Sequence, residues 1–182
     1  MGLVVTIGGL HGTGKSTYAR MIAKQFKLRY VSAGQLFRDL AKEKRISLEE
    51  LIRQAAKSPE IDRLIDERSA AEAAKGDTVI EGQLAAWMAK DRAQVRIYLK
   101  ASDEARIGRI ARRDHLDYET AHKQTLEREQ IQRDRYKRYY GIDTDDLSLY
   151  NVVVDTSDRS VESSSAELMS RIREILHQDR RV

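Results

Sequence analysis

Apolar residues along the chain form short runs that alternate with longer stretches of helical spacing. Five short runs, mostly apolar and often β-branched, predict buried strands at 3–7, 28–31, 78–81, 95–99 and 152–155. Between them, apolar positions repeat every three or four residues, as Tyr18, Met21, Ile22 and Phe26 do. This spacing predicts helices at 16–26, 35–44, 47–57, 58–75, 102–113, 117–139 and 160–177. The alternation predicts an α/β fold in which helices cover both faces of a five-stranded parallel sheet.

Several helices carry start and stop signals. Ser47, with Glu50 three residues later, fits a capping box, and Pro59 suits a first helical turn. Gly76 follows the last helical residue of the Ala-rich stretch and ends it. Two segments exceed what a simple strand–helix alternation needs: the all-helical stretch 34–75 and the Arg-rich stretch 106–139.

A phosphate-binding loop follows the first predicted strand and opens the first predicted helix. The pattern G-x-x-x-x-G-K-[ST] is matched by Gly9, Leu10, His11, Gly12, Thr13, Gly14, Lys15 and Ser16, with Thr17 next in the helix. The glycines let backbone N–H groups turn toward phosphate oxygens at the helix N-terminus. Lys15 is expected to reach the β- and γ-phosphates of ATP, and Ser16 to ligate Mg²⁺. The imidazole of His11 is expected to be a solvated side chain over the nucleotide, not a catalytic group.

Several classes of nucleotide-binding protein do not fit this chain. A GTPase would need N-K-x-D and D-x-x-G segments, and neither occurs. An ATP-driven machine would usually carry an apolar strand that ends in Asp-Glu, whereas Val79-Ile80-Glu81-Gly82 ends in one acid and a glycine. Among the nucleotide-binding classes considered, the small phosphotransferases are the ones that fit this chain.

Four further segments carry a family resemblance. They are Ser32-Ala33-Gly34-Gln35-Leu36-Phe37-Arg38, Glu81-Gly82 followed by Trp87-Met88, Arg135-Tyr136-Lys137-Arg138-Tyr139-Tyr140-Gly141-Ile142-Asp143, and Asp145-Asp146-Leu147-Ser148-Leu149-Tyr150. With these segments and the phosphate loop, the chain resembles the nucleoside monophosphate kinases, a family of P-loop phosphotransferases. It is most similar to the archaeal-type cytidylate kinases, and the resemblance covers essentially the whole chain.

The resemblance implies Mg²⁺-dependent transfer of the γ-phosphoryl group of ATP to CMP or dCMP, which gives CDP or dCDP. It also implies a single P-loop kinase domain over 1–182 with three parts. The core would be 1–33, 76–105 and 147–182, the helical monophosphate-binding insertion 34–75, and the Arg-rich lid region 106–146. The two segments that exceed the simple alternation fall in the insertion and the lid.

The candidate site residues combine this chemistry with the family resemblance. Phosphoryl transfer needs positioning and charge neutralisation, and the planar guanidinium of arginine binds phosphate oxygens bidentately. The resemblance implies that Arg38 holds the acceptor phosphate and that four lid arginines act, with Lys15, on the transferred group. The lid arginines are Arg109, Arg113, Arg128 and Arg135, and the acceptor-binding residues are Ser32, Gly34, Arg38, Glu81, Gly82 and Gln83.

Some positions depart from the family pattern or stay open. Gln83 stands where the family typically has an arginine that grips the acceptor phosphate, which predicts weaker acceptor binding or compensation by another arginine. Gln132 stands where the family often has an acid. Asp155-Thr156-Ser157 lies either near the donor base or at a helix cap. For Trp87, Tyr136, Tyr139 and Tyr140, packing is preferred over stacking on a base.

Composition and charge limit the kinds of protein and partner that the chain can represent. The 182 residues suit one domain, and 41% are hydrophobic, without cysteine or a run of about 18 apolar residues. With no signal-like N-terminus, we expect a cytoplasmic monomer that acts on nucleotides and binds neither nucleic acid nor membrane. The formal net charge is +4, and segment 106–139 holds ten basic and six acidic residues, a surplus of four. The alternatives are a kinase of AMP or another small acceptor and a nucleotide-dependent RNA-binding protein.

Overall fold

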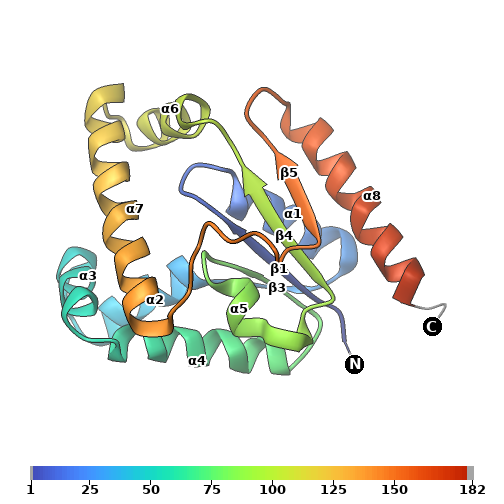
Figure 1. Ribbon diagram of the computed structural model, residues 1–182, viewed down its shortest axis with the longest axis horizontal. Helices are drawn as coiled ribbons and strands as arrows, with labels where there is room; N and C mark the ends of the chain where they lie inside the picture. Colours follow the sequence, from blue (N-terminus) through green and yellow to red (C-terminus); the bar gives the residue numbers. More distant parts are fainter. Residues whose placement is uncertain (1, 180–182) are drawn as a thin grey trace.

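The computed structural model describes residues 2–179 as a parallel sheet between two layers of helices (Figure 1). The strands are β1 (Val4–Gly9), β2 (Arg29–Ser32), β3 (Thr78–Glu81), β4 (Val95–Lys100) and β5 (Val152–Asp155). The helices are α1 (Lys15–Phe26), α2 (Ala33–Glu43), α3 (Leu48–Lys57), α4 (Glu60–Ala74), α5 (Ala85–Ala89), the 3-10 helix η1 (Lys90–Arg92), α6 (Asp103–Asp114), α7 (Tyr118–Tyr140) and α8 (Val161–Asp179). The predicted α/β class and the five predicted strands are confirmed.

The strand order β2-β3-β1-β4-β5, with every neighbouring pair parallel, places β1 at the centre of the sheet. Because the strands are parallel, their carboxyl ends meet at one edge. There Glu81 at the end of β3 is in register with Ile7 of β1 and with Ser32 of β2. Ligands of open parallel sheets bind at this edge, next to the point where strand order reverses. The phosphate loop that follows β1 therefore lies beside the ends of β2 and β3.

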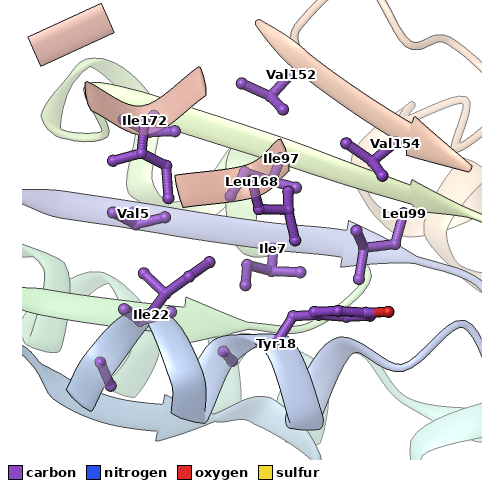
Figure 2. Close-up of a cluster of buried hydrophobic side chains, with 14 residues drawn as sticks. Val5, Ile7, Tyr18, Ile22, Ile97, Leu99, Val152, Val154, Leu168 and Ile172 are labelled. Carbon is purple, nitrogen blue, oxygen red and sulfur yellow. The ribbon is translucent and has the colours of Figure 1, made fainter. Parts of the chain in front are cut away.

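One face of the sheet is covered by α1 and α8. Alternate residues of the strands, such as Ile7 and Ile97, point toward this face and pack on Ile22 of α1 and on Leu168 and Ile172 of α8, as Figure 2 shows. All five side chains are fully buried. Burial of this apolar surface is the main stabilising contribution to the core, at roughly 25 cal/mol per Å².

The opposite face is covered by α4 and α5 near the middle of the sheet, where small alanine side chains let the helices approach Val4 and Ile80. Farther along, Tyr150 meets Trp87 and Tyr98 edge to face, with ring centroids 5.6 and 5.0 Å apart. Tyr150 also packs against Gly8, where a side chain would overlap the phenol. Trp87 therefore serves packing, as the sequence predicted.

Two groups of helices extend beyond the sheet, and α4 belongs to the first of them as well as to the layer on the sheet. The first, α2, α3 and α4 (here the insertion helices), encloses its own apolar cluster around Leu40, Leu51 and Ile65. In the second group, α6 packs on the start of α7 through Ile107 and Ala121. Helix α7 then runs from α6 toward α2 and α3 (Figure 1). None of the helices in residues 2–179 is long and apolar enough to cross a membrane.

Three details differ from the sequence-based expectations. The short α5 and η1 were not predicted, because a five-residue Ala-rich turn is too short to show a helical period. At α3, the Ser47 hydroxyl accepts the N–H of Glu50 at 3.1 Å, but the Glu50 carboxylate binds Arg53 and Gln54 instead of completing the capping box. The start of α8 is capped by Ser160, whose hydroxyl accepts the N–H of Ser163, and not by residues 155–157.

Candidate active site

The phosphate loop curls between β1 and α1 because three glycines adopt left-handed backbone angles. The φ angles of Gly9, Gly12 and Gly14 are 137°, 78° and 90°, which L side chains rarely adopt. A Cβ atom on Gly12 would also overlap the backbone of Arg106, so α6 packs directly on the loop. The first turn of α1 carries no acidic residue, which leaves its N-terminal partial positive charge available to an anion.

Lys15 lies inside this loop and donates from Nζ to the carbonyl oxygen of Leu10 at 2.7 Å. Burial lowers the pKa of Lys15 to about 8, although the nearby carboxylates of Glu81 and Glu129 act to raise it. The hydroxyl of the next residue, Ser16, donates to Oε1 of Glu81 at 2.9 Å. The ammonium and the hydroxyl that the motif requires are therefore held at the mouth of the loop, beside a carboxylate.

Glu81 organises the end of β3. Its Oε1 accepts hydrogen bonds from the hydroxyls of Tyr30 at 2.9 Å and Ser32 at 2.6 Å, in addition to Ser16. Burial and the negative charge of Glu81 raise the pKa of Tyr30, so the phenol remains a donor at neutral pH. The sequence placed Glu81 among the acceptor-binding residues, and the structure places it directly against the predicted Mg²⁺ ligand. Tyr30 was not anticipated.

A second buried carboxylate, Glu129 of α7, lies on the other side of the loop. Its Oε1 accepts the backbone N–H of His11 at 3.0 Å, contacts the His11 ring Nδ1 at 3.0 Å and accepts from Arg106 at 2.9 Å. Burial lowers the pKa of His11. The expectation of a solvated His11 is therefore wrong, because 23% of its side chain is exposed and its ring contacts Glu129. This cluster attaches α6 and α7 to the phosphate loop.

One cavity of about 710 Å³ joins these groups to the predicted arginines, and its size suits a ligand pocket. The cavity is lined from the phosphate loop by Lys15 and Ser16, and from the end of β3 by Glu81 and Gln83. All the predicted arginines line it as well: Arg38, Arg109, Arg113, Arg128 and Arg135. The structure thus brings most of the sequence-predicted site residues to one cavity.

The arginines differ in how they are held. Arg109 donates to the carbonyl oxygens of Gly12 and Ser157 at 3.4 and 3.1 Å and to the Thr156 hydroxyl at 3.2 Å, which ties the loop to the end of β5. Arg113 forms a two-pronged bond with Asp114. Arg128 differs from the other four cavity-lining arginines, because it forms no hydrogen bond or ion pair within residues 2–179.

Arg38 and Arg135 are both held by neighbouring side chains. Arg38 donates to the Gln35 side chain from Nε and Nη2 at 3.1 and 2.8 Å, which keeps its guanidinium on the cavity side of α2. Arg135 of α7 forms a buried ion pair with Asp62 of α4, with Nε 2.7 Å from Oδ2. This contact is charge–charge in character, because the N–H does not point at the oxygen.

Helix α7 makes two more contacts with the insertion helices. The Tyr140 hydroxyl donates to Oδ2 of Asp66, and the Tyr139 hydroxyl donates to the carbonyl oxygen of Ala56 at 3.2 Å. Tyr139 and Tyr140 therefore serve packing between helices, as the sequence predicted. Asp62 and Asp66 were missed, because a single acidic residue on a charged helix gives no signal in sequence that it faces a cavity.

The same fold and sequence pattern occur in known proteins. Residues 4–158 match the model of the cytidylate kinase-like family. A cytidylate kinase from Staphylothermus marinus is 43% identical over 162 residues, which cover 89% of this chain and 92% of that protein. A cytidylate kinase from Methanocaldococcus jannaschii is 45% identical over 163 residues, with 88% and 92% covered.

Solved structures with the same fold are more distant in sequence. A shikimate kinase from Bacteroides thetaiotaomicron superposes with a TM-score of 0.64 at 13% identity, over 94% of this chain and 98% of that one. A gluconokinase from Sinorhizobium meliloti gives a TM-score of 0.63 at 13% identity, over 97% and 94%. At this identity the likeness concerns the fold alone.

Proposed function

The chain belongs to the cytidylate kinase-like family, and we propose how its residues carry out the phosphorylation of CMP. ATP binds with its phosphates in the loop between β1 and α1, and CMP binds among the insertion helices. An oxygen of the CMP phosphate attacks the γ-phosphorus of ATP, and the bond to the departing ADP oxygen breaks. Because the acceptor supplies the nucleophile, the protein's work is positioning and charge neutralisation.

The single cavity that joins the phosphate loop to the insertion helices carries this proposal. It is lined by Lys15 of the phosphate loop, Arg38 of α2 and Arg128 of α7. Both substrates are anions, and in-line transfer needs them in contact within one water-excluding site. Arg128 binds the transferred phosphoryl group, because its guanidinium has no partner within residues 2–179. Arg113 also binds the transferred phosphoryl group, and to do so it releases its exposed partner Asp114.

Arg109 and Arg135 contribute less directly to the transfer than Arg128 does. Arg109 supports the loop from β5 and reaches the donor nucleotide, and Arg135 reaches the acceptor side through its ion pair with Asp62. Gln83 lines the same cavity and donates a neutral hydrogen bond to the acceptor phosphate. The nearby Arg38 supplies the charge that Gln83 lacks.

The donor-side residues also fit Mg²⁺. Ser16 is an exposed residue whose hydroxyl contacts Oε1 of Glu81, and the Glu81 carboxylate offers a second oxygen beside it. No cluster of three potential metal-binding side chains occurs among residues 2–179, so ATP phosphates and water complete the shell, as is usual for Mg²⁺. When bound, Mg²⁺ neutralises developing charge on the phosphates. Ser16 and Glu81 are the residues that would hold it.

We also propose that the protein acts as a monomer. The large exposed apolar side chains of residues 2–179 are Tyr118, Leu126 and Ile131 of α7, Val153 of β5 and Val161 of α8. A few exposed apolar residues distributed in this way are normal on a monomer and do not by themselves mark an association surface. Light scattering after size exclusion should give a mass near the 20.9 kDa of one chain, and a stable dimer would contradict the assignment.

The test of the function is a coupled assay of ADP release with ATP and each of CMP, dCMP, UMP, AMP and GMP. We expect CMP or dCMP to give the highest kcat/KM. Faster turnover of AMP or GMP would assign the site to another acceptor. No ADP release with any of the five would contradict the kinase assignment itself.

A further inference from the structure

Two carboxylates of α4 face the acceptor side of the cavity. Asp62 and Asp66 are one helical turn apart, and both line the cavity. Apart from Glu81, they are the only acidic residues that line it in the described part of the chain. Asp62 is 3% exposed, so the protein shields its carboxylate from most of the solvent.

Each of these carboxylates has one oxygen engaged by α7. Oδ2 of Asp62 pairs with Arg135, and Oδ2 of Asp66 accepts from the Tyr140 hydroxyl. Oδ1 of each accepts no hydrogen bond from any group within residues 2–179. Neither Oδ1 atom is among the buried atoms without a partner in residues 2–179, so both keep accessible surface. Because both residues line the cavity, each Oδ1 is open to a donor from a ligand bound there.

The groups around the pair suit a flat ring. Phe37, Ile52 and Ile65 from the three insertion helices line the same part of the cavity with apolar side chains. Burial raises the pKa of Asp62 to about 6. Burial, with the neighbouring charge of Asp62, raises the pKa of Asp66 to about 6. Two close carboxylates in apolar surroundings are stabilised by a group that brings N–H donors.

We propose that the exocyclic amino group of the acceptor base lies between Asp62 and Asp66 and donates one N–H to Oδ1 of each, an assignment that rests on the proposed kinase function. Side chains four positions apart on a helix have Cβ atoms about 5–6 Å apart. An amino nitrogen about 3 Å from each of two oxygens, with its N–H bonds about 120° apart, spans about 5 Å. The spacing of the pair therefore matches an amine that uses both hydrogens.

This arrangement separates cytosine from uracil. Cytosine presents the amino group at its 4-position, and uracil presents a carbonyl oxygen there. A carbonyl oxygen between two carboxylates would find no donor and would be repelled by both. A site built to accept a hydrogen bond rejects a ligand that lacks the donor strongly, because the buried acceptors are left unpaired. Asp62 and Asp66 are thus specificity-determining residues for the acceptor.

The first measurement uses the unaltered protein. We compare kcat/KM for CMP, for UMP and for the monophosphate of pyrimidin-2-one riboside, which has hydrogen in place of the 4-amino group. Hydrogen bonds to charged groups predict a loss of about 10- to 100-fold for the ring without the amine, and a larger loss for UMP. Equal turnover of CMP and the analogue would overturn the proposal without any variant.

The second measurement uses Asp66→Asn and Asp62→Asn, whose amides can donate to the uracil carbonyl. We expect the CMP-to-UMP ratio of kcat/KM to fall by about 10-fold or more in each, while the analogue changes little. Glu67→Gln removes the same charge from the exposed side of α4 and should leave the ratio unchanged. A parallel fall for all three substrates would indicate a structural role and overturn the inference. No turnover of CMP by the unaltered protein would instead contradict the proposed function.

Discussion

The two halves of the cavity are built by different means. The proposed donor half centres on a contiguous stretch, 8–17, whose shape comes from glycine backbone angles and local bonds such as Lys15 to Leu10, although Glu81 and Glu129 also contact it from distant elements. The proposed acceptor half has no such contiguous stretch: it is assembled from side chains of α2, α3, α4 and α7, and the Tyr140–Asp66 bond joins residues 74 positions apart. The comparison teaches that the shape of the phosphate loop is encoded locally, whereas the proposed acceptor site depends on long-range side-chain pairs.

The largest effect is expected in the donor half. Lys15→Ala should lower kcat/KM by about 10³-fold, because a preorganised charge aimed at the transferred phosphoryl group is lost. Folding should persist, since the loop's shape comes from its glycines, and thermal melting should show little change. Lys24→Ala, on the exposed side of the same helix, is the matched control and should retain full activity. Retained turnover in Lys15→Ala would mean that the loop does not bind the donor.

In the acceptor half, one substitution should act mainly on stability. Arg135→Ala leaves the buried Asp62 carboxylate without its partner, which is expected to cost about 3 kcal/mol in the free energy of unfolding. The double variant Asp62→Asn/Arg135→Ala should recover part of that loss, because no buried charge remains. Denaturant unfolding measures both, with exposed Arg138→Ala on the same helix as control. Equal stability of Arg135→Ala and Arg138→Ala would show that the ion pair does not form.

The halves should also differ in their response to alkaline pH. Lys15, with its pKa lowered to about 8, loses its proton in the free protein above that pH. Bound phosphate favours the charged ammonium, so binding of ATP must take up a proton there. The affinity for ATP should therefore fall by up to about tenfold per pH unit above pH 8, while the affinity for CMP stays nearly level. Titration calorimetry from pH 7 to 9.5 checks this, and parallel curves for the two nucleotides would contradict it.

The smallest effect concerns a helix cap in the acceptor half. Ser47→Ala removes the hydroxyl that accepts the Glu50 N–H at the start of α3, at a cost of about 1 kcal/mol. Since Ile52 of α3 lines the acceptor side of the cavity, fraying should raise the KM for CMP and leave the KM for ATP unchanged. Ser47→Asp, which keeps a capping oxygen, should restore both stability and KM. A rise in both KM values would show that α3 does not act on the acceptor alone.

The sequence alone predicted those parts of the fold and of the candidate site that depend on local residue patterns. The strands, the long helices, the phosphate loop and the family resemblance all come from residues close together in the chain. The contacts of Glu129 with His11, and of Asp62 and Asp66 with α7, could not be predicted in this way. They depend on where α7 crosses the other elements, and the charged sequence of α7 has no dominant apolar face that fixes its direction. Glu129 and Glu127 look alike in sequence, although only Glu129 is buried.

The central claim is that the two halves form one site for transfer between two bound nucleotides. The most direct measurement is calorimetric titration with a bisubstrate ligand, in which the two nucleosides are joined through a chain of phosphates. The account predicts one ligand per chain, bound at least about 100-fold more tightly than either ATP or CMP alone, because the second half binds intramolecularly. Affinity no greater than that of ATP alone would contradict it, since the P-loop and the insertion helices would then hold their ligands apart.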